Sequence, residues 1–304
     1  MTELRNKVSN VSTGTLCELF GKSRQAYYQQ DKSNYKEAVK ADIIMKFVQD
    51  QRKLMPRLGA RKLHHLLKSQ FPEDLHLGRD AFFDLLRDNQ LLIRRRRNTV
   101  RTTFSSHWLH KYPNLIREFT PGKSHQLWVS DITYVETKDG FVFLFLITDA
   151  YSRKIIGWSV GETLEAKHAV MALNMALKQL PGDAVNLIHH SDRGIQYCSA
   201  LYVKILKKYH IQISMTENGD PLENAIAERI NGVLKSEWIY DLNLVNKQMA
   251  RKELGRIINI YNIYRPHTSV NMMTPEMAHK QVGEINRLWK NYYKKKPEIA
   301  HEIK

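Results

Sequence analysis

A carboxylate in the middle of an apolar run is the feature that most constrains how this chain can fold. The run LWVSDITYV has the composition of a β-strand, and it places Asp131 among Val129, Ile132 and other apolar residues. An unpaired carboxylate in such surroundings costs on the order of several kcal/mol. Ordinary core packing therefore explains Asp131 poorly, and a specific use of its charge is expected.

Two further acids ask for the same explanation. Asp192 ends an apolar run in HHSDRGIQY, and thirty-five residues separate it from Glu228. Glu228 lies in NAIAERINGVLKSEW, which has a helical pattern. At 100° per residue an apolar stripe lies opposite a polar face centred on Glu228. The apolar stripe contains Leu222, Ile226, Ile230, Val233 and Leu234, and the polar face contains Asn224, Glu228, Asn231 and Lys235.

Simpler interpretations exist for each acid. Asp192 can shape the turn that it begins, and Glu228 can be a solvated helix residue in a favourable relation to Lys235. The rival acids are weaker candidates, because Glu223 and Glu237 lie toward the apolar stripe and Asp149 has no matching motif.

Three carboxylates without a Cys or His/Cys cluster have the ligand chemistry that Mg²⁺ prefers. Cleavage or joining of a phosphodiester needs stabilisation of negative charge at phosphorus and activation of an oxygen nucleophile. Two Mg²⁺ ions about 3.5–4 Å apart supply both, and Mn²⁺ is expected to substitute. We therefore expect two ions, with Asp131 bridging them and Asp192 and Glu228 each holding one.

Charge points to a polyanionic partner. The 304 residues have a formal net charge of +16. Residues 1–120 hold 23 basic and 12 acidic side chains, residues 121–240 hold 12 and 13, and residues 241–304 hold 12 and 6. The basic surplus therefore flanks a nearly neutral middle.

The sequence also favours a reducing cytosol and no membrane span. Cys17 and Cys198 form no disulfide framework or zinc motif. The longest apolar run, FVFLFLIT, has eight residues, against the roughly 20 that a spanning helix needs. The N-terminus has no secretory signal. A cytoplasmic, nucleoid-associated protein is expected.

Two helical modules are expected before the middle region. Residues 1–35 suit a helix-turn-helix-like segment, with the turn at Gly21 to Ser23, Ser23 as a helix N-cap and the second helix ending at Gln30. A plain packed helix pair is the alternative. Residues 36–105 suit a second module. In it a helix from Glu37 to Leu54, with Val39, Ile43 and Phe47 on one face, and two shorter helices form a small apolar centre.

A run of arginines lies near the end of residues 1–105. The run holds five arginines with no acid among them: Arg94, Arg95, Arg96, Arg97 and Arg101. Such a run can be a solvated linker, but guanidinium groups bind phosphates bidentately, which favours contact with a DNA backbone. Residues 106–122 are then a linker that ends at Pro121-Gly122.

Residues 123–240 alternate in the manner of a mixed α/β domain. Three strand-like runs, joined by short turns, are followed by a helix, a strand, a second helix and a fifth strand. In residues 241–304 we expect a helix from about Asn246 to Tyr264 and a basic tail. The pattern alone supports only a mixed sheet with helices.

The three acidic motifs together resemble the DDE transposases of the retroviral-integrase superfamily. The closest likeness is to the second-frame product of two-frame bacterial insertion sequences. WVSDITYV, HSDRGIQY and NAIAERINGVLK carry the likeness, together with the tail YNIYRPHTSVNMMTPEM. The matching tail positions are Tyr261, Asn262, Arg265, Pro266, His267, Thr274 and Pro275. Asn271 stands where the family has a glycine, and no integrase-type zinc ligand set precedes the core.

The resemblance implies a ribonuclease-H-like, five-stranded mixed sheet with helix-turn-helix-like N-terminal modules and a helical C-terminal tail. It implies that Asp131, Asp192 and Glu228 are catalytic, with Asp131 and Asp192 on adjacent strands. It also implies a DNA contact by Lys235 beside the metal site. Asn224, Asn231 and Arg265 are further candidate DNA contacts.

The expected function is transposition. Double-stranded element ends would be cut with Mg²⁺, and the freed 3′-OH would be joined to target DNA. A homo-oligomer on DNA would do this, with or without an upstream-frame protein. Two alternatives stay open at this point. One is a nuclease of the same fold that never joins strands, and the other is a DNA-binding repressor with a silent core.

Overall fold

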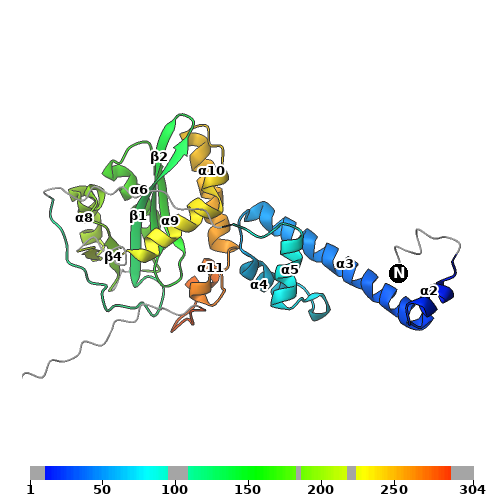
Figure 1. Cartoon of the computed structure of the whole chain (residues 1–304). Coiled ribbons are helices and arrows are strands. Elements are labelled where there is room, and N and C mark those ends of the chain that lie inside the picture. Colours follow the sequence, from blue (N-terminus) through cyan, green and yellow to red (C-terminus); the bar gives the residue numbers. More distant parts are fainter. Residues whose placement is uncertain (1–10, 95–108, 183–185, 218–223, 289–304) are drawn as a thin grey trace, which may run out of the picture. The chain divides into compact units, whose positions relative to one another are not determined.

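A computed structural model describes residues 11–94, 109–182, 186–217 and 224–288. The chain divides into two compact units, one made of residues 1–54 and 58–93 and the other of residues 55–57 and 94–304. Each unit has its own core and is described by itself (Figure 1). None of the described helices is long and apolar enough to cross a membrane.

The first unit is helical. Its elements are α2 (Thr13–Leu19), α3 (Arg24–Leu54), α4 (Ala60–Gln70), the short 3₁₀ helix η1 (Glu73–Leu75) and α5 (Arg79–Asp88). Ser23 begins α3 as predicted, because its hydroxyl accepts a hydrogen bond from the Ala26 N–H at 3.1 Å. The core consists of side chains that are almost wholly shielded from solvent: Ile44, Phe47, Val48, Leu58, Leu63, Leu67, Phe82 and Leu86.

The helix α3 corrects two predictions. We expected a break between Gln30 and Glu37, but α3 is continuous and runs through the expected boundary at residue 35. The segment between these residues contains no Gly or Pro, so nothing in it stops a helix. The predicted apolar face was also wrong in part, since Val39 and Ile43 are exposed and the neighbouring Ile44 is buried.

The second unit is built on a mixed five-stranded sheet in the order β3-β2-β1-β4-β5. The pairs β1–β2 and β2–β3 are antiparallel, whereas β4 is parallel to both β1 and β5. The strands are β1 (Leu127–Thr137), β2 (Gly140–Asp149), β3 (Ile155–Gly161), β4 (Ile188–Ser191) and β5 (Gln212–Met215). This arrangement is the ribonuclease-H-like fold that we expected.

Helices cover both faces of this sheet (Figure 1). Alternate residues of β1 serve opposite faces, as the two-residue period of a strand requires. Trp128 packs with α6 (Ala166–Leu177), α7 (Ile195–Cys198) and α8 (Ala200–Lys208) on one face. Leu127 and Val129 pack with α9 (Ala225–Glu237) on the other.

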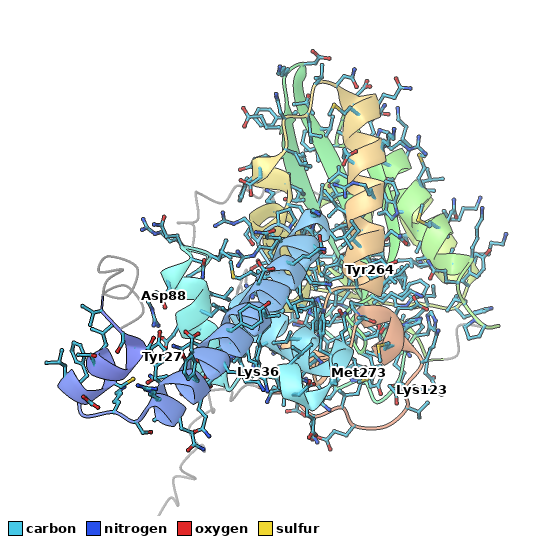
Figure 2. The ribbon with its side chains drawn as sticks, turned by 90° about the vertical axis from the view of Figure 1, so that its right-hand side faces the viewer. Tyr27, Lys36, Asp88, Lys123, Tyr264 and Met273 are labelled. Atoms are coloured by element: carbon cyan, nitrogen blue, oxygen red, sulfur yellow. The ribbon has the colours of Figure 1, made fainter. Side chains whose placement is uncertain are left out.

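A C-terminal segment completes the unit. It contains η2 (Ile239–Asp241), α10 (Lys247–Ile263), η3 (Thr268–Val270) and α11 (Pro275–His279). The long helix α10 contacts β3 and α9, and Figure 2 shows Tyr264 at its end, where the chain turns toward Met273. The Lys-rich end that we predicted as a basic tail lies outside the described residues.

Candidate active site

Strand register brings Asp131 and Asp192 to the same level of the sheet. β1 and β4 pair in parallel from Leu127 opposite Ile188 to Val129 opposite His190. Continued by two residues, this register places Asp131 beside Asp192, which follows the last residue of β4. Neighbouring strands lie about 5 Å apart, so the two carboxylates begin from adjacent backbone positions.

The loop after β4 fixes the Asp192 carboxylate. Its Oδ1 accepts a hydrogen bond from the Gly194 N–H at 3.0 Å. A Cβ at position 194 would lie only 2.9 Å from that same oxygen. The glycine of the SDRG motif therefore permits the carboxylate to turn back over its own backbone.

Two asparagines attach α9 to β1. Asn224 Nδ2 donates to the Ser130 carbonyl oxygen at 3.0 Å, and Asn231 Nδ2 donates to Asp131 Oδ2 at 2.8 Å. Glu228 lies between them in the first turn of α9, with its side chain exposed. The helix thus brings Glu228 to the central strand β1, close enough to Asp131 for its charge to act on that carboxylate.

The three carboxylates act on one another electrostatically. Burial raises the pKa of Asp131 to about 7, and the negative charges of Asp192 and, more weakly, Glu228 add to this rise. The hydrogen bonds from Asn231 and from the Ile132 N–H oppose it. Across the described ranges, no three His, Cys, Asp or Glu side chains are already grouped closely enough to hold a metal ion.

Lys235 lies beside this cluster, two turns beyond Glu228. Its ammonium nitrogen is 4.1 Å from the centre of the Tyr134 ring, a cation–π contact. Burial lowers the pKa of Lys235, whereas the charge of Asp131 opposes that fall. The side chain is half-buried, and it lies close enough to Asp131 for the two charges to interact.

Comparison with known proteins identifies the chain's family. Residues 121–221 and 209–275 match two families that are both described as the integrase core domain. A 31 kDa protein of insertion element IS600 from Shigella sonnei is 32% identical over 268 residues, covering 86% of this chain and 96% of that protein. The transposase InsF of insertion sequence IS3A from Escherichia coli is 32% identical over 223 residues, covering 72% and 76% respectively. The chain belongs to the DDE transposases of the integrase superfamily.

Solved structures similar to this transposase include the HTLV-2 integrase catalytic core, described as in complex with magnesium. It is 18% identical, with a TM-score of 0.41, over 52% of this chain and 97% of that one. A simian T-cell lymphotropic virus intasome chain is 15% identical, with a TM-score of 0.46, over 77% of each chain. By its family the transposase is an enzyme of the polynucleotidyl transferase type.

The structure gives Asn224 and Asn231 a use inside the protein that we did not predict. Both are buried, with 7% and 6% of their surfaces exposed, and each donates to β1. Each amide nitrogen therefore spends one hydrogen bond inside the protein, and the contacts of these residues with phosphates stay a prediction.

Arg265 also has partners inside the protein. Its guanidinium is 1% exposed and forms a two-bonded ion pair with Glu237, at 2.7 Å and 2.5 Å. The same guanidinium donates to His267 Nε2 at 2.7 Å. The DNA contact stays a prediction, and reaching a phosphate would require this buried ion pair to break. Glu237, which the sequence pattern places toward the apolar stripe, is the partner of that pair.

The tail motif of this transposase fastens α10 to the edge strand β3. Asn262 accepts from the Ile155 N–H and donates to the Ile155 carbonyl oxygen, both at 2.9 Å. The Tyr261 hydroxyl donates to the Arg153 carbonyl oxygen at 3.0 Å. Asn271 adopts the left-handed backbone conformation, with φ of 52°, which asparagine tolerates better than most residues. This explains how it can stand in place of a glycine.

Several predicted residues lie outside the described part of the chain. These are Glu223 and the arginines Arg95, Arg96, Arg97 and Arg101. Arg94 is described and exposed, and its carbonyl oxygen accepts a hydrogen bond from Arg57 at 2.7 Å.

Sequence reasoning missed one charged residue, Arg153. It stands in YSRK, in a turn between two strands, where no sequence motif distinguishes it from a solvated turn residue. The structure places its side chain in the core of the second unit, with only 8% of it exposed.

Proposed function

We propose that this transposase cuts the DNA at the ends of its element and joins the freed 3′-OH to another phosphodiester. In this proposal Asp131, Asp192 and Glu228 are the catalytic residues and require Mg²⁺. The observation that supports the proposal is the approach of Asp192 and Glu228 to Asp131 on the central strand, where their charges help to raise the pKa of Asp131.

The donor set fits a hard divalent cation. All three side chains offer only carboxylate oxygens, the ligands that Mg²⁺ prefers. Both oxygens of Asp131 already accept one hydrogen bond each, and each keeps acceptor capacity for an ion. Asp131, Asp192 and Glu228 would together hold the two ions. Such ions supply charge stabilisation at phosphorus and a more acidic nucleophile.

The protein's own residues prepare this site. Asn231 orients Asp131 through Oδ2, and Gly194 orients Asp192 through Oδ1. Lys235, held beside Tyr134 and near Asp131, is positioned to bind a phosphate of the strand being cut. Asn224 fixes the start of α9 and so limits where Glu228 can lie.

The remaining parts of the chain would bring DNA to this site. We assign residues 1–35 and 36–105 to recognition of element ends and residues 106–122 to a linker. Residues 123–240 would form the catalytic core, and residues 241–304 would form the C-terminal helix and basic tail. Arg94 to Arg97 and Arg101 would contact the DNA backbone without reading bases. We also infer a homo-oligomer on paired element ends and action together with an upstream-frame protein.

The test is incubation of the full chain with labelled element-end DNA and Mg²⁺, with cleaved and joined products resolved on one gel. Asp131→Asn, Asp192→Asn and Glu228→Gln should each abolish both products and leave DNA binding nearly intact. Because the three residues act as a unit, double substitutions should cost little more than single ones. Glu136→Gln, an exposed change on the same strand as Asp131, is the matched control.

Each other outcome identifies a different protein. Cleavage without joined products would mean a nuclease of this fold, and binding without either product would mean a repressor. Substantial joining by Glu228→Gln would show that another acid completes the site. Activity undiminished by EDTA would remove the metal from the mechanism.

A further inference from the structure

A cavity of about 460 Å³ opens in the second unit beside the candidate catalytic residues. Leu127 and Val129 of β1 form its floor, and Asn224, at the start of α9, forms part of one wall. The turn after β2 contributes Arg153, and the segment that follows α11 contributes Arg287. Its volume is within the range of sites that hold small ligands.

Arg153 lines this cavity in an unusual state. The residue is 8% exposed, and its Nη1 is buried without a hydrogen-bond partner among the described residues. A buried charge without a partner is costly, so such groups normally pair. The nearby buried acid, Asp149, is engaged by the His125 N–H and by Ser152. The guanidinium therefore keeps a donor that the described part of the protein does not satisfy.

The backbone fixes this guanidinium in place. Arg153 has φ of 69°, the left-handed region that L-residues rarely adopt. Its N–H donates to the Asp149 carbonyl oxygen at 2.9 Å, and its carbonyl oxygen accepts from Tyr261 at 3.0 Å. Burial, followed by the nearby charge of Arg287, lowers the pKa of Arg153 to about 10, so the group stays charged at neutral pH.

The cavity wall suits an oxyanion. It carries two guanidinium groups and one carboxylate, Glu284, so positive charge is in excess. Thr120, Ser269 and Asn286 add hydroxyl and amide donors. Arginine binds phosphate oxygens through two parallel hydrogen bonds, which matches the fixed position of Arg153.

The cavity also lies next to the candidate catalytic residues. Val129 is two residues from Asp131 on the same face of β1, a rise of about 7 Å along the strand. Asn224 lines the cavity and also donates to Ser130, the residue before Asp131. A DNA strand bound at Asp131 therefore has the cavity within reach of its flanking nucleotides.

We propose that the cavity between Arg153 and Arg287 is a phosphate subsite that binds a backbone phosphate of the DNA strand flanking the scissile bond. This inference rests on the proposed function, because it places the substrate strand at Asp131.

The test measures binding of the full chain to element-end DNA in EDTA, with one phosphate at a time replaced by a neutral methylphosphonate. For the unaltered protein, one replacement near the scissile bond should weaken binding about tenfold. Arg153→Gln should weaken binding to unmodified DNA by a similar factor and should lose nothing more on that modified DNA. Arg153→Lys should keep part of the affinity. Arg256→Gln, an exposed arginine of α10 paired with Glu253, should behave like the unaltered protein.

The proposal would be overturned if the affinity losses from Arg153→Gln and from the methylphosphonate added at every phosphate position. It would also be overturned if the Arg153→Gln protein bound DNA as tightly as the original. Arg287→Gln, on an exposed segment, repeats the test without risk to the core. A rise in melting temperature with inorganic phosphate that Arg153→Gln abolishes, without any coupling to methylphosphonates, would mean a free-anion site and not a DNA subsite.

Binding without metal ions separates this inference from the proposed function. If the Arg153→Gln and methylphosphonate effects failed to add in a protein that neither cuts nor joins DNA, that result would support the subsite and reject the proposed function. Normal cleavage and joining with effects that simply add would support the function and reject the subsite.

Discussion

Asp131 is a proposed metal ligand, and the fold without metal disfavours its negative charge. Its pKa of about 7 in the folded protein lies above the ordinary value of 3.8. The folded state therefore binds more protons than the unfolded state between these values. A raised pKa of this kind gives stability that is present at low pH and lost as pH rises toward 7.

We predict that, in EDTA, the free energy of unfolding falls by roughly 2–4 kcal/mol between pH 4 and pH 8 because of this group. Asp131→Asn should remove most of that slope. Mg²⁺ at pH 8 should restore stability to the unaltered protein and not to the variant. Urea unfolding at a series of pH values measures all three quantities, and equal slopes in the two proteins would contradict the prediction.

Asn231 should affect the reaction through Asp131 and not through DNA. We predict that Asn231→Ala lowers the cleavage rate about 10–100-fold and raises the Mg²⁺ concentration that gives half of the maximal rate, with little change in DNA affinity. Asn259→Ala, an exposed asparagine of α10, is the control. If Asn231→Ala lost DNA affinity while the Mg²⁺ concentration for half of the maximal rate stayed the same, Asn231 would be a DNA contact.

At the scale of the elements, the ion pair between Glu237 and Arg265 joins the end of α9 to the segment that directly follows α10. Removing one partner leaves the other charge buried, which typically costs about 3–5 kcal/mol. We predict this loss of stability for Arg265→Met, and a partial recovery when Glu237→Gln is added. Arg256→Met, whose arginine is half-exposed, should change stability by less than about 1 kcal/mol. Weaker DNA binding by Arg265→Met at full stability would support a direct contact between Arg265 and DNA.

The sequence predicted the strands well because strand formation depends on local pattern. Alternation and short turns located β1, β2 and β3, and the family resemblance placed Asp131 and Asp192 on adjacent strands before any register was known. The uses of Asn231 and Arg265 could not be predicted in this way. A polar side chain on a helix looks solvated until the neighbouring element is placed, and arginine is seldom fully buried. Arg153 was missed for the same reason, since its surroundings come from β1, α9 and the C-terminal segment.

At the scale of the whole molecule, the surplus of basic side chains lies in residues 1–120 and 241–304, whereas the proposed catalytic residues lie in residues 121–240. We predict that changing Arg94 to Arg97 all to Ala weakens binding to matched and mismatched DNA alike, because phosphate contacts carry no sequence information. The dependence of log K on log salt should become shallower by about 0.9 for each phosphate that the variant no longer binds. Binding at several salt concentrations tests this, and an effect confined to the cognate sequence would make these arginines base readers.

The Asn262 clamp on Ile155 also sets an order of events during synthesis. The two residues are separated by 107 positions, so a ribosome that adds about 5–20 residues per second makes the clamp roughly 5–20 seconds after the strand that it closes. Asn231 likewise follows Asp131 by 100 positions. During that interval the basic N-terminal arm is already outside the ribosome, whereas β3 still has an open end and Asp131 has no amide partner. The proposed active site is therefore complete only when most of the chain has been synthesised, and the rate of translation sets when that happens.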